Sequence, residues 1–96
     1  MNTIRIADVV GGTYTNVDGY TLKCAIDRYV KNGMPVFLSF ENATAISSSF
    51  FNSSFGALID EYGIDKFKEY EKPINITKTQ LDNMRKLIDK IAVYSN

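Results

Sequence analysis

The segment PVFLSFENATAISSSFFNSSFGALIDEY, residues 35–62, decides the fold of this chain. It begins with the apolar run 36–40, which is short and rich in β-forming residues and therefore predicts a buried strand. A polar turn follows, and three serines then precede a run of apolar residues that repeat at helical spacing. These are Phe50, Phe51, Phe55, Leu58, Ile59 and Tyr62. The segment therefore predicts a strand, a turn and a helix over about 47–62, which is half of a βαβ unit.

The residues before this segment predict a first strand and a first helix. Residues 3–10 are rich in Ile and Val and predict a strand that ends in a turn at Gly11 and Gly12. Residues 13–15 suggest a short second strand that pairs with the first in a hairpin. Apolar residues then repeat at helical spacing up to residue 31, with N-cap candidates at residues 16–18 and a glycine C-cap at residues 32–33.

The residues after the segment complete an alternating pattern. Residues 64–72 are highly charged and predict either a short helix or an irregular link, and residues 73–77 predict a short strand. Thr77 or Thr79 caps a last helix, whose inward stripe is Leu81, Met84, Ile88 and Ile91. This order favours one α/β domain over residues 1–96, with a mixed or mostly parallel four-stranded sheet and about three main helices.

The composition argues against several classes of protein. Eleven basic and eleven acidic side chains cancel, so no strong field attracts nucleic acid or an anionic membrane. No apolar run approaches the roughly 20 residues of a membrane span, and the N-terminus does not resemble a signal peptide. The single cysteine, Cys24, fits a reducing cytosol, and we expect it to be an inert, partly buried thiol. We therefore expect a cytoplasmic protein without nucleic-acid or membrane partners.

The residue patterns of known catalytic sites are largely missing. The chain has no histidine, which excludes Ser-His-Asp and Cys-His arrangements and most zinc sites. It has no glycine-rich motif for a dinucleotide or a nucleotide phosphate. The carboxylates of Glu41, Asp60 and Glu61 form no obvious acid–base pair. We therefore expect a protein that is not an enzyme, holds no metal and needs no cofactor.

Ser47, Ser48 and Ser49, at the start of the predicted second helix, are the first candidate site. One serine at an N-cap satisfies a free backbone amide, so the structural interpretation is plain capping. Three serines are more than a cap needs. The alternative is a site for a covalent phosphate, an anion or a partner, which the positive end of the helix dipole would favour.

The outward face of the same helix is the second candidate site. Its side chains are mostly small and uncharged, unlike the Lys and Glu that are typical of a solvated face. Gly56 in a helix interior costs about 1 kcal/mol relative to alanine, which indicates a packing reason. One interpretation is a docking surface made of Ser48, Asn52, Ser53, Gly56 and Asp60. The other is that the last helix or the N-terminal hairpin covers this face.

Two motifs resemble the STAS-like domain family, which shares the fold of the anti-anti-sigma factors. The first is Asn16-Val17-Asp18-Gly19 at the start of a helix, and the second runs from Phe40-Glu41-Asn42 to Ile46-Ser47-Ser48-Ser49-Phe50. The resemblance is to small bacterial and phage domains without an established function. It implies a regulatory module whose protein partner is a histidine-kinase-like ATPase or another regulator.

The resemblance also suggests a modification site. In phosphorylated STAS proteins the helix opens with an aspartate, the modified serine, a serine or threonine, and a glycine. These positions fall on Ser47, Ser48, Ser49 and Phe50, so the modified position is represented by Ser48, while the aspartate and the glycine are absent.

Three functions follow as hypotheses. The first is a non-catalytic regulatory or protein-interaction module that docks through the N-terminal half of its second helix. The second is a module that binds a small anion or a nucleotide at the same helix N-terminus. The third is a self-associating structural subunit that forms a homodimer through the small-residue face.

Overall fold

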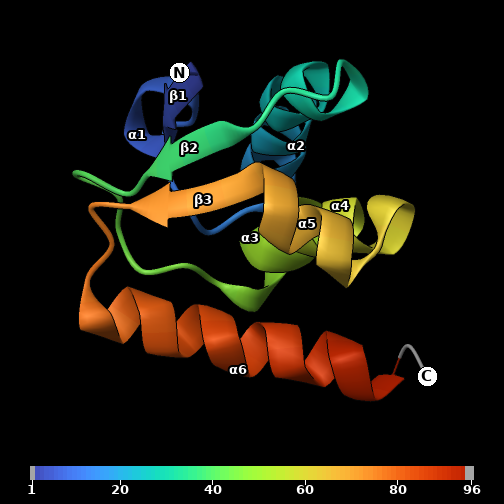
Figure 1. Cartoon of the computed structure of the whole chain (residues 1–96). Helices are drawn as coiled ribbons and strands as arrows, with labels where there is room; N and C mark the ends of the chain where they lie inside the picture. The colour runs from blue at the N-terminus through green and yellow to red at the C-terminus, as the bar shows by residue number, and fades with distance from the viewer. Residues whose placement is uncertain (1, 95–96) are drawn as a thin grey trace.

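Three short parallel strands form the sheet of the molecule (Figure 1). The computed structural model describes residues 2–94, and their side chains as far as residue 91. The strands are β1 (Asn2–Arg5), β2 (Val36–Ser39) and β3 (Glu71–Ile74), in the order β1-β2-β3. In the register of the sheet, Leu38 lies between Ile4 and Pro73. The sequence order and the parallel pairing are those of consecutive βαβ units.

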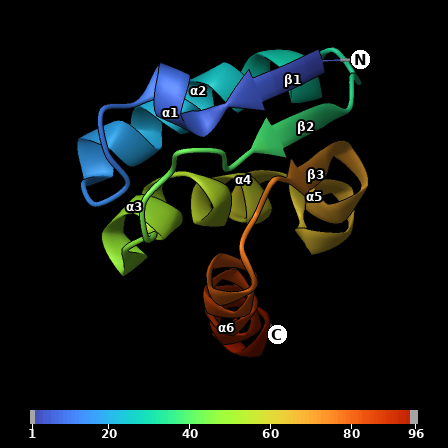
Figure 2. The same cartoon turned by 90° about the vertical axis from the view of Figure 1, so that its left-hand side faces the viewer.

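Helices make the connections between the strands. A single turn, α1 (Ile6–Val9), and the long helix α2 (Asn16–Lys31) join β1 to β2. Three shorter helices join β2 to β3: α3 (Ser48–Ser53), α4 (Phe55–Tyr62) and α5 (Ile64–Tyr70). The last helix, α6 (Lys78–Tyr94), follows β3. In Figures 1 and 2, α3 and α4 lie between α2 and α6, so their two sides pack on different helices. None of the described helices is long and apolar enough to cross a membrane.

The core lies on one face of the sheet. Ile4, Val36 and Leu38 are buried, whereas Thr3 and Lys72, which belong to the opposite face, are exposed. The predicted apolar stripe of the second helix is confirmed, because all its members are buried except Tyr62, which is half-buried.

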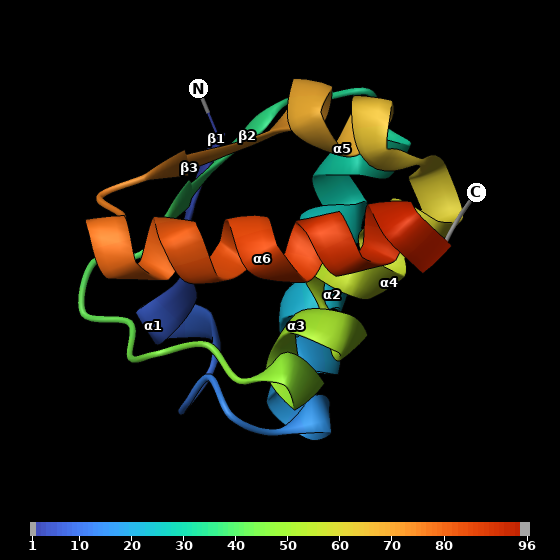
Figure 3. The same ribbon diagram turned by 90° about the horizontal axis from the view of Figure 1, so that it is seen from below.

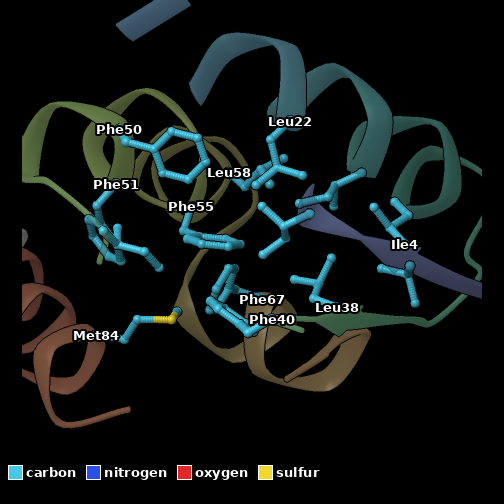
Figure 4. Close-up of a cluster of buried hydrophobic side chains, with 14 of the residues drawn as sticks. Ile4, Leu22, Leu38, Phe40, Phe50, Phe51, Phe55, Leu58, Phe67 and Met84 are labelled. Atoms are coloured by element: carbon cyan, nitrogen blue, oxygen red, sulfur yellow. The ribbon is translucent and has the colours of Figure 1, made fainter. Parts of the chain in front are cut away.

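Aromatic rings fill the centre of this core (Figure 4). The ring centroid of Phe55 lies 6.0 Å from that of Phe51, 6.0 Å from that of Phe67 and 6.3 Å from that of Phe40. Such tilted and offset pairs add to the free energy of apolar burial. Phe55 therefore ties the residue that follows β2 and the helices α3, α4 and α5 into one core.

The N-terminal segment differs from its prediction. The first strand ends at Arg5 instead of continuing to residue 10, and residues 13–15 form no strand, so the sheet of the described residues has three strands and not four. The physical reason is side-chain bonding. Thr13 is buried, and its Oγ1 donates to the backbone oxygen of Ala45 at 2.7 Å and lies 2.7 Å from Thr44 Oγ1. Residue 13 is therefore held to the loop after β2 and not to a neighbouring strand.

The predicted helix 47–62 is interrupted at Ser54. This residue has φ −109° and ψ −90°, and it separates α3 from α4. Its side chain is fully buried, and its hydroxyl donates to the backbone oxygen of Phe50 at 2.7 Å. A serine that bonds back to the preceding turn competes with the helical hydrogen bonds and bends the chain. The protein consequently has more helices than the three predicted.

Several predicted helix ends are confirmed. Ser47 is the N-cap of α3, and Gly33 and Gly63 follow α2 and α4 with φ of 68° and 90°. Thr77 and Gln80 bond each other's backbone amides in a capping box at the start of α6. The N-cap of α2 is Thr15, whose Oγ1 accepts from the amide of Asp18, and not one of residues 16–18 as predicted.

Candidate functional site

Ser47 has a structural role as a cap. Its hydroxyl oxygen accepts from the Phe50 amide at 3.1 Å, and its hydroxyl donates to the Tyr14 backbone oxygen at 2.7 Å. The Ser47 amide also donates to the Thr13 backbone oxygen at 3.0 Å. Ser47 therefore caps α3 and joins the start of this helix to the segment before α2. These two structural roles explain why a serine stands at this position.

Ser48 and Ser49 occupy the first turn of α3, and both are exposed. Since Ser47 already provides the cap, the structure does not need these two serines for that purpose. The two positions differ in their surroundings, because Ser48 and not Ser49 lines a groove between α3, α4 and α6.

The groove has a volume of about 620 Å³. Figure 3 shows α6 passing in front of α4, with α3 beside it. From α3 and α4 the groove is lined by Ser48, Asn52, Gly56, Ala57 and Asp60, and from α6 by Leu87, Lys90 and Ile91. Four of the five predicted docking residues thus lie together. The last helix also approaches this face. One part of the face is therefore open, in line with the docking interpretation, and another part packs against the last helix, in line with the alternative that this helix covers it.

Gly56 explains how α6 approaches α4. It is buried, and a Cβ atom at this position would lie 3.4 Å from Ile91 Cδ1 and 3.3 Å from the Phe51 backbone oxygen. A larger side chain would push α6 outwards. The packing reason that the sequence indicated for Gly56 is therefore the contact with α6.

Ser53, the fifth predicted docking residue, lies elsewhere. Its hydroxyl donates to the backbone oxygens of Ser49 at 2.9 Å and Phe50 at 3.2 Å. It faces Gly19 of α2, where a Cβ atom would collide with Ser53 Oγ and lie 2.6 Å from the Phe50 backbone oxygen. Ser53 therefore belongs to the contact between α2 and α3 and not to the groove.

A polar cluster joins α2 to α4. The hydroxyl of Tyr62 donates to the Asp27 carboxylate, which also pairs with Lys31 at 3.1 Å. The hydrogen bond from Tyr62 lowers the pKa of Asp27, and the same bond raises the pKa of Tyr62 to about 12. Both groups therefore keep their usual charge states at neutral pH, and the cluster connects two helices.

Glu71 is a residue whose position the sequence did not reveal. It is 4% exposed, and its Oε1 has no hydrogen-bond partner among the described residues. Burial raises the pKa of this carboxyl to about 8. In the sequence, Glu71 reads as one more solvated side chain of the charged run 64–72, before the strand predicted at residues 73–77. The structure instead begins β3 at Glu71 and ends it at Ile74.

Cys24 is exposed and not partly buried as predicted. It lies in a shallow depression with Val9, Tyr20 and Arg28, away from the groove. The described residues include no group of three or more side chains of the metal-binding types that could hold an ion.

Comparison with protein families gives one result. A model described as a STAS-like domain of unknown function matches residues 18–81, which is more than half of the chain. The match begins within α2, includes β2 to β3 and stops within α6. No curated protein and no solved structure shows a significant match to the chain.

Proposed function

The chain belongs to the STAS-like domain family of unknown function, and from that membership we propose that it is a non-catalytic regulatory module that docks a partner protein in the groove. The observation that carries the proposal is the placement of Ser48, Asn52, Gly56 and Asp60 along one depression. Its occupant is a segment of a regulatory partner, for which the family resemblance suggests a histidine-kinase-like ATPase.

The lining of the groove suits a protein segment. Gly56 and Ala57 form a floor of small residues, Leu87 and Ile91 supply apolar contact, and Asp60 and Lys90 add a charge of each sign. An apolar centre with polar groups at its edge is the usual composition of a protein interface.

Ser48 is the residue through which docking would be regulated. It is exposed and lies on the groove, so a kinase can reach it and a partner would contact it. A phosphate there adds a charge of about −1.5 to −2 at neutral pH. That charge would change the affinity for any partner segment that lies beside it.

The two other hypotheses have less support. A small anion would rest on α3, which has six residues, and the amide of Phe50 in its first turn already donates to Ser47. Such a short helix offers a weak dipole. A homodimer would use the same groove with a second copy as the occupant, so the binding experiment has to include the oligomeric state.

The proposal is tested by the affinity between the purified domain and a histidine-kinase-like ATPase of its host. Asn52→Arg and Asp60→Lys change exposed residues of the groove. Glu69→Lys on α5 is the matched control, because it makes the same charge reversal at an exposed position outside the groove. We expect each groove variant to weaken binding by about tenfold or more, which corresponds to about 1.4 kcal/mol, and the control to bind normally.

Circular dichroism and thermal unfolding establish that each variant is folded. Equal affinity of wild type and both groove variants would contradict the proposal. Light scattering of the wild type at two concentrations tests the homodimer, and a dimer that the groove variants dissociate would favour self-association instead.

A further inference from the structure

A second cavity lies on the other side of α6, between this helix, the sheet and α5. We call it the Glu71 cavity, after the buried residue that begins β3 in its wall. It has a volume of about 200 Å³ and is separate from the groove. Figure 4 shows Met84 of α6 pointing towards the rings of Phe40 and Phe67, which belong to the same wall. The walls of the cavity therefore come from three parts of the fold.

The interior of the Glu71 cavity is almost wholly apolar. Glu71 contributes almost no polar surface to it, because its unpartnered Oε1 is buried and closed off from the space. An engineered apolar cavity of about 150 Å³ in another protein stays dry and binds benzene. The part of a ligand that enters the Glu71 cavity must therefore be hydrocarbon.

The mouth of the cavity is positively charged. Lys68, Lys72 and Arg85 line the cavity and are exposed, so it opens to solvent where α5, β3 and α6 meet. Since the surface inside is almost free of polar atoms, these side chains line it with their hydrocarbon stems and hold their charged ends in solvent. The Nζ atom of Lys72 donates to the Lys68 backbone oxygen at 2.8 Å, which keeps this charge beside the last turn of α5.

The three cations at the mouth are not neutralised by neighbouring carboxylates. Among the described residues, none of the three is part of an ion pair. The only acidic residue of the lining is Glu71, which is buried. An anionic group at the mouth would therefore be attracted by three cations, and a cationic group would be repelled.

The volume of the cavity limits the length of the hydrocarbon. By proportion to benzene in a cavity of about 150 Å³, a space of about 200 Å³ holds about eight carbon atoms. It is too small for the two acyl chains of a membrane lipid. A charged head group stays outside, because the burial of an unpaired charge in apolar surroundings is strongly unfavourable. The ligand is therefore a single short chain with an anionic head at the mouth.

We propose that the Glu71 cavity binds a medium-chain fatty acid in its ionised form. The hydrocarbon chain lies in the cavity against the aromatic rings, and the carboxylate stays at the mouth beside the three cations. Octanoate is the probe of this class. Octylammonium is the matched probe with the same chain and the opposite charge, and butyrate is the probe whose chain is too short to fill the space.

The test is a titration of the wild-type protein with the three probes at about pH 7, where all three are charged. It is followed in ¹H–¹⁵N NMR spectra, at concentrations below micelle formation. We expect octanoate to shift the amides of Leu38 and Phe67, which line the cavity, and not those of Gly56 and Ala57, which line the groove. Octanoate should bind about tenfold more tightly than octylammonium. It should exceed butyrate by at least about tenfold, because each buried CH₂ group raises the affinity about fourfold.

Two variants at neighbouring positions of α6 test the charge at the mouth. Arg85→Glu reverses a charge that lines the cavity, so it should weaken octanoate by about threefold or more and strengthen octylammonium. Lys86→Glu makes the same reversal at the next exposed residue, which does not line the cavity. This control should keep its affinity for octanoate within about twofold of wild type.

A third variant tests the space, and thermal unfolding establishes that all three variants are folded. Leu81→Phe narrows the cavity from a half-buried position and should weaken octanoate and octylammonium alike. The proposal is overturned if octanoate shifts none of the cavity amides or shifts the groove amides instead. It is also overturned if octylammonium binds as tightly as octanoate, if Arg85→Glu and Lys86→Glu affect octanoate equally, or if Leu81→Phe leaves both affinities unchanged.

Discussion

Glu71 begins β3 with a carboxyl group that burial keeps protonated far above its usual range. Its pKa rises from 4.5 to about 8 because apolar side chains replace water around it. Between these two pH values the folded protein holds a proton that the unfolded chain releases. The stability linked to that proton is therefore fully present below about pH 4.5, and it is lost as the pH rises through about 8. The loss amounts to at most about 1.4 kcal/mol per pH unit.

Glu71→Gln is expected to remove this pH dependence, because the amide keeps the shape of the protonated carboxyl and does not ionise. The variant should be close to wild type in stability at about pH 5 and clearly more stable at about pH 8. Urea unfolding at several pH values measures the difference. The exposed Glu69→Gln is the control and should follow the wild-type curve. Parallel curves for wild type and Glu71→Gln would show that Glu71 ionises in the folded protein much as it does in the unfolded chain.

Tyr62 and Asp27 produce the opposite dependence at acid pH. The pKa of Asp27 is lowered, so its contribution is present above its ordinary pKa of 3.8 and is lost as the pH falls through the lower value of the folded protein. Tyr62→Phe removes the hydroxyl that donates to Asp27. We expect a loss of about 1 kcal/mol at neutral pH, and a smaller loss in strong acid. Acid and urea unfolding of the two proteins measure both values, and a loss that does not change with pH would contradict this account.

At the level of secondary structure elements, the sequence predicted the helix ends that are determined by residues close to them in the chain. A serine cap for the second helix, glycines at the ends of two helices and a threonine cap for the last helix are signals read within a few residues, and the structure shows them at Ser47, at Gly33 and Gly63, and at Thr77. The apolar run after Arg5 has no such signal. It reads as a strand, yet Ile6 is fully buried as the first residue of α1. Tertiary burial there outweighs the local preference.

The break at Ser54 has the same kind of cause. Nothing in the sequence distinguishes Ser54 from the exposed serines of the same segment. Only the fold shows that its hydroxyl is buried against the Phe50 backbone oxygen, where it ends α3. The docking face was predicted from side-chain size, but Ser53 could not be separated from it, because that requires the position of α2.

Two glycines test how closely the helices pack. Gly19→Ala is expected to cost several kcal/mol, because its Cβ would meet Ser53 Oγ and would lie 2.6 Å from the Phe50 backbone oxygen, which cannot move alone. Gly56→Ala is the matched control. Its Cβ would have contacts of 3.3 Å and 3.4 Å, and the gain in helix propensity of about 1 kcal/mol opposes that crowding.

Thermal and urea unfolding of both glycine variants measure these costs. Gly19→Ala should be much the less stable of the two, and adding Ser53→Ala should recover only part of the loss, because the backbone oxygen remains in place. Equal stability of Gly19→Ala and Gly56→Ala would show that α2 and α3 can separate at little cost.

At the level of the whole molecule, the candidate sites depend on where α6 lies. The sequence predicted the helix and its apolar stripe, but it could not predict that depressions would remain on both sides of it. The carboxyl of Glu71 was missed for the same reason. Residues 64–72 alternate charges with aromatic anchors, and only the packing of α5, β3 and α6 removes one of those charges from water.

The attachment of α6 leads to the last prediction. Of its apolar stripe, only Met84 is buried, whereas Leu81, Ile88 and Ile91 are half-buried. Side-chain amides add two bonds to the loop after β2, from Gln80 to the Ala43 oxygen at 3.0 Å and from Asn83 to the Ile46 oxygen at 2.9 Å. A helix with few buried contacts opens at a lower free energy than the core. We therefore expect α6 to open locally while the sheet remains folded.

Native-state hydrogen exchange measures this directly. The amides in the middle of α6 should exchange with a lower free energy of opening than that of Leu38 in β2, which we expect to exchange through global unfolding. Met84→Ala should lower the protection of α6 further, because it removes the buried anchor of the helix. If the α6 amides are instead as protected as Leu38, then α6 unfolds together with the core. The groove and the Glu71 cavity would in that case be permanent features of the fold, open to a ligand only through the mouths that they already have.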